Sequence, residues 1–374
     1  MSKRAALVLE DGRAFHGYAF GADVVGEGEV VFNTCMTGYQ EICTDPSYRG
    51  QIVALTYPLI GNYGVADKDA ESRRPWLAGL AVRDLSLDYS NWRAETDLHA
   101  YLIKYGIPGI FGFDTRALTR HLRTKGTLRA VLSPLEDQGD IEQLVRKARR
   151  IVPLSEQDLV AQASISQRYA FLGASDSGER PATDPRIAVI DCGIKENILR
   201  SMSGRGTEVV VVPHDVHVED ILELSPQGVL VSNGPGDPAS LPELAQVVRG
   251  LLERRMPLFG ICLGHQLLGL AIGATTSRLK FGHHGGNHPV RDVITNRVYI
   301  TSQNHEFQVD RDSIPRENGY FVSHFNLNDG SVEGLAHATE PVFSVQYHPE
   351  GSPGPQDNQY LFDRFCSLVV SRGG

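Results

Sequence analysis

A short apolar run that leads directly into a helical pattern constrains this chain more than any other segment. Pro257 to Ile261 favours a buried strand, Leu263 to Ala271 favours a helix, and Cys262 lies at the junction. Gly260 and Gly264 stand two positions before and after the cysteine, as in the tight turn that exposes a nucleophilic serine. The unpaired N–H groups at a helix start also favour a negative sulfur. This spacing therefore indicates a nucleophile, although a lone cysteine is more often a buried structural residue.

A second motif offers the base, and the group that orients it, which such a nucleophile needs. The apolar run Val342–Val345 predicts a strand, and His348 and Glu350 follow it on either side of Pro349. Proline fixes its own φ and favours extended geometry in the residue before it. We therefore expect His348 and Glu350 to hold a fixed relative placement in an extended segment.

A third motif is a predicted strand, Val229–Ser232, that ends in a glycine-rich turn. Gly234 and Gly236 would let backbone N–H groups approach a ligand closely, as an oxyanion hole or a carboxylate cradle requires. An ordinary turn between a strand and a helix is the alternative interpretation.

Together, and in this order along the chain, the three motifs resemble the class I (triad) glutamine amidotransferases over residues 187–374. The resemblance implies that Cys262 attacks the side-chain amide of L-glutamine and forms a glutamyl thioester. His348 would transfer the proton and Glu350 would orient its imidazole. The products would be glutamate and ammonia.

Segments elsewhere in the chain resemble the small chain of carbamoyl-phosphate synthetase; they are residues 29–48, 51–58, 113–120, 191–197 and 280–289. This resemblance implies a set of glutamine-binding residues: Ser47, Gly234, Gly236, Leu263, Gln266, Asn304 and Phe307. It also implies a large subunit that receives the ammonia and makes carbamoyl phosphate from it with bicarbonate and ATP, for arginine and pyrimidine synthesis. The sequence has no Walker-type phosphate loop. We therefore expect no cofactor or metal in this chain, and ATP and a divalent metal on the large subunit.

The expected fold class is α/β, with two domains. Residues 1–150 would form a β-rich α/β domain that docks the large subunit, and residues 151–186 would connect it to the next domain. In residues 187–374, strands alternate with helices, which predicts an open, mostly parallel sheet. The polar, breaker-rich stretch 173–185 is the expected linker.

Composition excludes some classes of partner and favours a compartment. The net charge of −9 argues against nonspecific nucleic-acid binding, which needs a basic surface. We find no apolar run of membrane-spanning length and no signal-peptide pattern. The five cysteines show neither metal spacing nor a disulfide framework, so a reducing cytoplasm is expected. His283, His284 and His288 lack the paired ligand spacing of a zinc site, and we expect them to shape a pocket mouth instead.

One residue departs from the amidotransferase pattern. The segment Gln303–Phe307 reads Gln-Asn-His-Glu-Phe, with Glu306 where the family usually has glycine. A carboxylate aimed into the site would repel the α-carboxylate of glutamine, so we expect Glu306 to weaken substrate binding. A positive φ at this position would also strain the backbone.

Two other functions remain as alternatives. The chain could be an amidotransferase subunit that serves another acceptor, although the N-terminal motifs disfavour this. It could also be a noncatalytic regulatory subunit, because of Glu306, although Cys262, His348 and Glu350 are all present.

Overall fold

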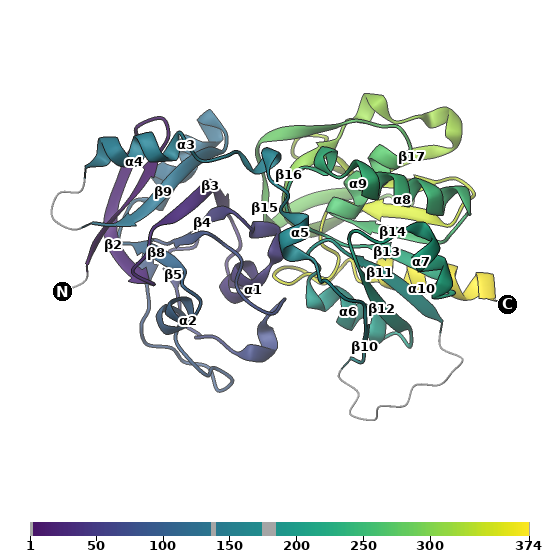
Figure 1. Cartoon of the computed structure of the whole chain (residues 1–374), viewed down its shortest axis with the longest axis horizontal. Helices are drawn as coiled ribbons and strands as arrows, with labels where there is room; N and C mark the ends of the chain where they lie inside the picture. Colours follow the sequence, from purple (N-terminus) through teal and green to yellow (C-terminus); the bar gives the residue numbers. More distant parts are fainter. Residues whose placement is uncertain (1–2, 136–139, 174–184, 374) are drawn as a thin grey trace. The chain divides into compact units, whose positions relative to one another are not determined.

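The computed structural model describes residues 3–135, 140–173 and 185–373 (Figure 1). The chain forms two compact units: Met1–Gln157 with Lys280–Gly285, and Asp158–Leu279 with Gly286–Gly374. The linker expected at 173–185 lies outside the described residues except at its two ends. Among the helices of the described segments, none combines the length and the apolar character needed to cross a membrane.

The first unit is built on a closed β-barrel. Its strands follow one another in the order β1 (Arg4–Leu9), β2 (Ala14–Gly21), β8 (Pro108–Phe111), β6 (Gly79–Ala81), β4 (Gln51–Leu55), β3 (Gly26–Asn33) and β9 (Leu128–Pro134). β1 and β2 form an antiparallel hairpin around Asp11 and Gly12, a residue pair that favours tight hairpin turns. Antiparallel pairing of β1 with β9, in which Leu7 faces Leu132, closes the barrel. The β-rich character was expected, but barrel closure depends on a pairing that no local pattern announces.

Helices cover this barrel. They are α1 (Tyr39–Thr44), α2 (Leu98–Lys104), α3 (Thr115–Lys125) and α4 (Ile141–Ala148), and a separate pair of short strands is formed by β5 (Leu59–Ile60) and β7 (Asp84–Leu85). Both faces of β3 are buried, because Val30 and Phe32 pack in one cluster with α3 while Val31 packs in another with α1 and α2. Such two-sided burial explains why these strands read as continuous apolar runs.

The second unit contains one large sheet. Its strands lie in the order β10 (Tyr169–Phe171), β12 (Glu208–Pro213), β11 (Arg186–Asp191), β13 (Gly228–Val231), β14 (Leu258–Ile261), β19 (Val342–Val345), β18 (Val332–His337), β17 (Tyr320–Asn326), β15 (Thr276–Asp292) and β16 (Arg297–Val309). The strands from β12 to β19 pair in parallel, as the sequence predicts. Antiparallel strands extend the sheet on both sides, and β10 comes from the segment that was expected only to connect the domains.

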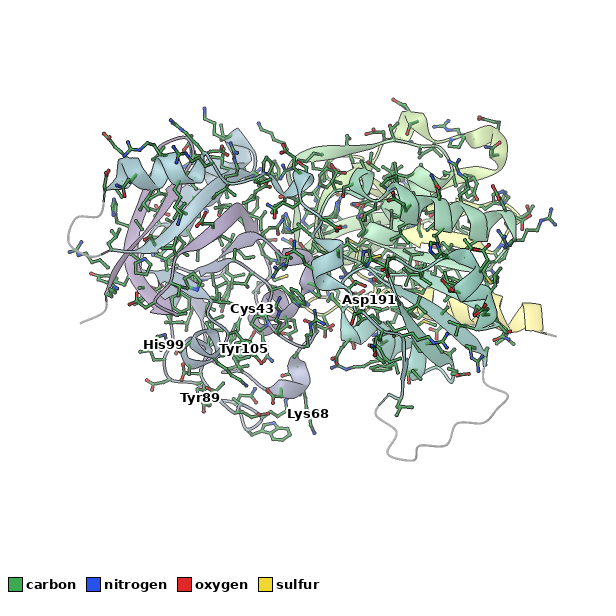
Figure 2. The ribbon with its side chains drawn as sticks, in the orientation of Figure 1. Cys43, Lys68, Tyr89, His99, Tyr105 and Asp191 are labelled. Carbon is green, nitrogen blue, oxygen red and sulfur yellow. The ribbon has the colours of Figure 1, made fainter. Side chains whose placement is uncertain are left out.

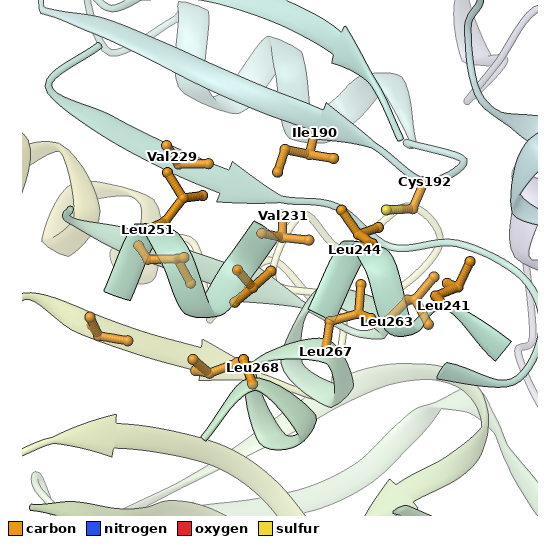
Figure 3. Close-up of a cluster of buried hydrophobic side chains, with 14 of the residues drawn as sticks. Ile190, Cys192, Val229, Val231, Leu241, Leu244, Leu251, Leu263, Leu267 and Leu268 are labelled. Carbon is orange, nitrogen blue, oxygen red and sulfur yellow. The ribbon is translucent and has the colours of Figure 1, made fainter. Parts of the chain in front are cut away.

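Helices pack on both faces of the parallel strands. They are α5 (Val160–Ala163), α6 (Glu196–Ser203), α7 (Val218–Glu223), α8 (Pro242–Glu253), α9 (Leu263–Ala271) and α10 (Tyr360–Gly373). Alternate residues along each strand face opposite sides. On β13, Val229 and Val231 pack with leucines of α8 and α9 (Figure 3), whereas Leu230 packs with the cluster that includes α6 and α10. This sandwich holds the carboxyl ends of β11, β13 and β14 beside one another, which is where open sheets of this kind place ligands.

Candidate functional site

Cys262 lies in the strained turn between β14 and α9. Its backbone has a φ of 55° and a ψ of −103°, a sparsely populated conformation that costs a residue with a side chain about 1–3 kcal/mol. The two flanking glycines leave no room for a larger residue. A Cβ on Gly260 would lie 2.5 Å from the carbonyl oxygen of Gly264, and one on Gly264 would lie 2.1 Å from that of Val231. The predicted elbow is confirmed, and close packing of strand against helix is the reason for both glycines.

Hydrogen bonds fix the backbone of this turn. The N–H of Cys262 donates to the carbonyl of Val345 over 2.9 Å, which ties the elbow to β19. The N–H of Gly264 donates to the carbonyl of Ser232 over 3.1 Å, which ties it to the end of β13. The side chain of Cys262 is 2% exposed, and its Sγ lies 3.5 Å from the carbonyl oxygen of Asn304.

His348 and Glu350 meet through a turn and not along an extended segment. The N–H of His348 donates to the carbonyl of Ser302, and the N–H of Gly351 then donates to the carbonyl of His348 across Pro349 and Glu350. His348 itself is extended, in a bridge with Ser302, as the proline predicts, but the turn at Pro349 and Glu350 corrects the expectation that the extended segment continues to Glu350. The turn brings the Oε1 of Glu350 to 2.7 Å from the Nδ1 of His348. In an extended strand, the Cα atoms of residues two apart stand roughly 6.5 Å apart.

The charges of this pair stabilise each other. Burial by itself would lower the pKa of His348, but the Glu350 carboxylate outweighs it and, with a contribution from Cys262, raises that pKa to about 10. Burial by itself would raise the pKa of Glu350, but Lys195 and His348 hold that pKa at about 2. The imidazole is therefore protonated at neutral pH and hydrogen-bonded to a carboxylate. Among the described residues the buried Nε2 of His348 has no partner within hydrogen-bonding distance, and the side chain of Cys262 is one of the groups that raise the pKa of this ring.

Lys195 is a member of this network to which the sequence motifs gave no role. Its ammonium group is buried, and Nζ lies 2.7 Å from the Oε1 of Glu350. The amide of Asn197 donates to the backbone carbonyl of Glu350 over 2.7 Å. The sequence did hold a signal for a role of these two residues, because both belong to the segment 191–197 that carries the family resemblance. The burial of Lys195 is a second signal, since a lysine is rarely buried unless it is paired.

The turn after β11 places Lys195. Asp191, which is labelled in Figure 2, ends this strand, and its Oδ1 accepts from the N–H groups of Gly193 and Ile194 over 2.8 Å each. The side-chain oxygen of Asn233 accepts from the N–H of Lys195 over 3.1 Å. These bonds join the lysine turn to the glycine-rich turn that follows β13.

The two glycines of that turn are required for different reasons. A Cβ on Gly234 would lie 2.2 Å from the carbonyl oxygen of Cys192, so only glycine fits there. Gly236 has a φ of 95°, which a larger residue rarely adopts. Both glycines follow β13, which pairs with β14, the strand that ends just before Cys262. Their part in holding glutamine stays a prediction.

The remaining predicted glutamine-binding residues are divided between the units. In the second unit, Leu263 packs its side chain in the apolar core, so only its backbone could face a ligand. Gln266 donates its amide to the carbonyl of Phe307 over 2.8 Å, which fastens β16 to α9. Asn304 lies beside the thiol through its carbonyl oxygen. Ser47 belongs to the first unit, where its N–H donates to Asp45 in a short helical turn, Pro46–Tyr48.

Glu306 has a partner that the sequence did not reveal. It lies within β16, so it needs no left-handed backbone and the missing glycine causes no strain. Its Oε2 lies 2.6 Å from Nη2 of Arg278. The expectation that an uncompensated carboxylate repels the substrate is therefore incomplete, because a guanidinium offsets that charge.

Comparison with known proteins matches both parts of the chain. Residues 188–368 match the family "Glutamine amidotransferase class-I", and residues 7–132 match "Carbamoyl-phosphate synthase small chain, CPSase domain". The chain belongs to the carbamoyl phosphate synthase small-chain family. Its enzyme class is accordingly that of a glutamine amidotransferase.

Three relatives named carbamoyl phosphate synthase small chain are similar over almost the whole chain. The one from Symbiobacterium thermophilum is 49% identical, over 96% of this chain and 97% of its own. That from Methanopyrus kandleri is 50% identical, over 98% and 99%. That from Aquifex aeolicus is 48% identical, over 99% and 100%. Membership is thus shown over both units and not only over the amidotransferase part.

Proposed function

We propose that this chain hydrolyses L-glutamine as the small subunit of a carbamoyl phosphate synthase and supplies ammonia to a large subunit. The observation that carries the proposal is the elbow Cys262 together with the buried His348–Glu350–Lys195 network. The noncatalytic alternative requires a decayed site, and the contacts among these residues are intact.

In this proposal the sulfur of Cys262, as a thiolate whose proton is already on His348, attacks the amide carbon of glutamine. Backbone N–H groups hold the developing oxyanion. The N–H of Leu263 is suited to this role, because the first N–H groups of a helix lack an intrahelical acceptor. Gly234 is the second candidate. His348 gives its Nε2 proton to the departing nitrogen, so the C–N bond breaks and ammonia leaves a glutamyl thioester.

Water then completes the reaction. The imidazole of His348, now neutral, removes a proton from water as the oxygen attacks the thioester carbon. The C–S bond breaks, glutamate leaves, and the proton stays on His348. Glu350 keeps the imidazole ring of His348 oriented throughout. The ammonium group of Lys195 balances the negative charge of the buried Glu350 carboxylate.

Ser47, Gly236, Gln266, Asn304 and Phe307 are proposed to hold the substrate. The large subunit is proposed to carry ATP and a divalent metal, with no cofactor in this chain, and the carbamoyl phosphate would serve arginine and pyrimidine synthesis. All five cysteines are free thiols. This fits the reduced Cys262 that the chemistry needs and the proposed cytoplasmic location.

Replacement of Cys262 by serine in the chain assembled with its large subunit tests the proposal. We expect glutamine-dependent synthesis to fall by about 10⁴-fold or more, as for loss of other enzyme nucleophiles. Synthesis from added ammonium salt should stay at the wild-type rate, because only the amide step needs the thiol. A variant that keeps substantial glutaminase activity would show that Cys262 is not the nucleophile.

A further inference from the structure

An ion pair lies on the strands β15 and β16, close to the proposed glutamine site. Nη2 of Arg278 lies 2.6 Å from Oε2 of Glu306, and the guanidinium lies 5.9 Å from the ring centroid of Phe307. The side chain of Glu306 is 7% exposed and that of Arg278 is 33% exposed. The carboxylate of Glu306 is therefore largely removed from water, whereas water still reaches the guanidinium of Arg278.

Counted along the strand backbone, Glu306 stands at a spacing from the thiol that suits the far end of glutamine. Asn304, whose carbonyl oxygen is 3.5 Å from Sγ of Cys262, stands two residues before Glu306 on the same strand. Two residues of a strand span roughly 6.5 Å. In glutamine, a pair of methylene groups separates the reacting amide from the α-carbon, so its ammonium and carboxylate groups would extend over a similar distance.

We infer that Arg278 and Glu306 act together as a specificity element that matches the two opposite charges of an amino acid. Glu306 accepts from the α-ammonium group, and Arg278 attracts the α-carboxylate and cancels the charge of Glu306. The inference rests on the proposed function, because it needs glutamine to react at Cys262. It assigns a role to Arg278, and it explains how a carboxylate is tolerated at position 306.

Energetics favour a paired arrangement over a lone acid. A buried carboxylate without a cation is costly and would also repel the substrate carboxylate. Arginine suits position 278 because its planar guanidinium group can pair with a carboxylate and lie against an aromatic ring at the same time. A lone Glu306 would favour cationic ligands, and a lone Arg278 would favour anionic ones. The pair favours a molecule that carries both charges.

Glutamine analogues that lack one charge test this inference. The probes are 4-aminobutanamide, which keeps the ammonium group, and glutaramate, which keeps the carboxylate. Their dissociation constants are measured by protection of Cys262 from iodoacetamide, which needs no turnover. In Arg278→Met, glutaramate should bind about tenfold more weakly, the scale of a lost charged hydrogen bond, and 4-aminobutanamide more tightly. In Glu306→Gln, both changes should reverse sign.

Glutamine hydrolysis gives the second readout. Arg278→Met should raise KM for glutamine by about tenfold or more with kcat within about twofold, because the lost interaction is uniform between ground and transition state. The double variant Arg278→Met, Glu306→Gln should recover part of this loss, because it removes the unpaired carboxylate. Arg278→Lys should retain most of the affinity. The exposed Arg311, replaced by methionine, is the matched control.

Each outcome supports or overturns the inference. Analogue constants in Arg278→Met that match those of the Arg311→Met control overturn it, as do constants that move in the same direction for both analogues. A loss of folding in Arg278→Met leaves Glu306→Gln and Arg278→Lys to decide by the same constants. Failure of the proposed function is distinguishable, because the wild-type chain would then lack glutaminase activity altogether.

Discussion

Two strand segments beside the nucleophile hold their residues by different means. At the end of β14, backbone packing and backbone hydrogen bonds place Cys262, and the clashes at Gly260 and Gly264 leave no freedom. On β16, Glu306 is placed in regular extended backbone, and its environment is set by the charge of Arg278. The difference teaches that backbone geometry decides where the sulfur lies, while side-chain charges decide which substrate suits it.

The largest expected effect separates the reacting groups from the group that orients them. His348→Asn should lower the glutaminase kcat about as much as loss of Cys262, because groups that act as a unit fail together. Glu350→Gln should keep a glutaminase kcat about a hundredfold or more above that of His348→Asn, since the imidazole itself remains. Steady-state rates check this order. A larger loss in Glu350→Gln than in His348→Asn would show that the roles are reversed.

Stability should respond strongly to the elbow. Gly264→Ala should lower the free energy of unfolding by about 3 kcal/mol, because the new methyl group meets the carbonyl of Val231. Gly273→Ala is the matched control at the other end of α9. Nothing lies within 4 Å of its Cβ position, so only its positive φ should matter, at about 1 kcal/mol. Urea unfolding of both variants measures the contrast, and equal losses would exclude close packing as the reason for Gly264.

The pH dependence of stability should reveal the buried charges. The pKa of His348 rises from 6.5 to about 10 on folding, so its protonation stabilises the fold fully below pH 6.5. That stabilisation is lost as pH rises through about 10. The unfolding free energy of the wild type, measured against that of His348→Asn, should therefore decline across this window. A difference that stays constant between these pH values would contradict the protonated state assigned here.

The smallest expected effect concerns salt and the charge pair. From roughly 0.1 to 1 M salt the Debye length falls from about 10 to 3 Å, so exposed charges lose most of their reach. KM for glutamine should rise slightly in the wild type, where attraction is screened. In Arg278→Met it should fall, because the repulsion from Glu306 is screened. The same sign in both proteins would argue that an unpaired Glu306 does not repel the substrate carboxylate.

Local patterns predicted much of the second unit. The strands β13, β14 and β19 and the helix α9 lie within a residue or two of their expected positions. This succeeds because an apolar run bounded by breakers, or a periodic apolar face, carries its own structural preference. The glycines of the elbow were likewise readable, since only a tight turn requires them at that spacing. Closure of the barrel through β1 and β9 was not readable, because it joins segments more than a hundred residues apart.

The sequence by itself determined the alternation of strands and helices around the parallel sheet, the elbow at Cys262 and the presence of His348 and Glu350. Only the tertiary structure decided how those groups are paired. Lys195 reaches Glu350 across 155 positions, and Arg278 reaches Glu306 across 28. The physical reason is range. Backbone preferences act over a few neighbouring residues, whereas a buried charge must find its partner wherever the fold brings one near, and that partner leaves no mark in the local sequence.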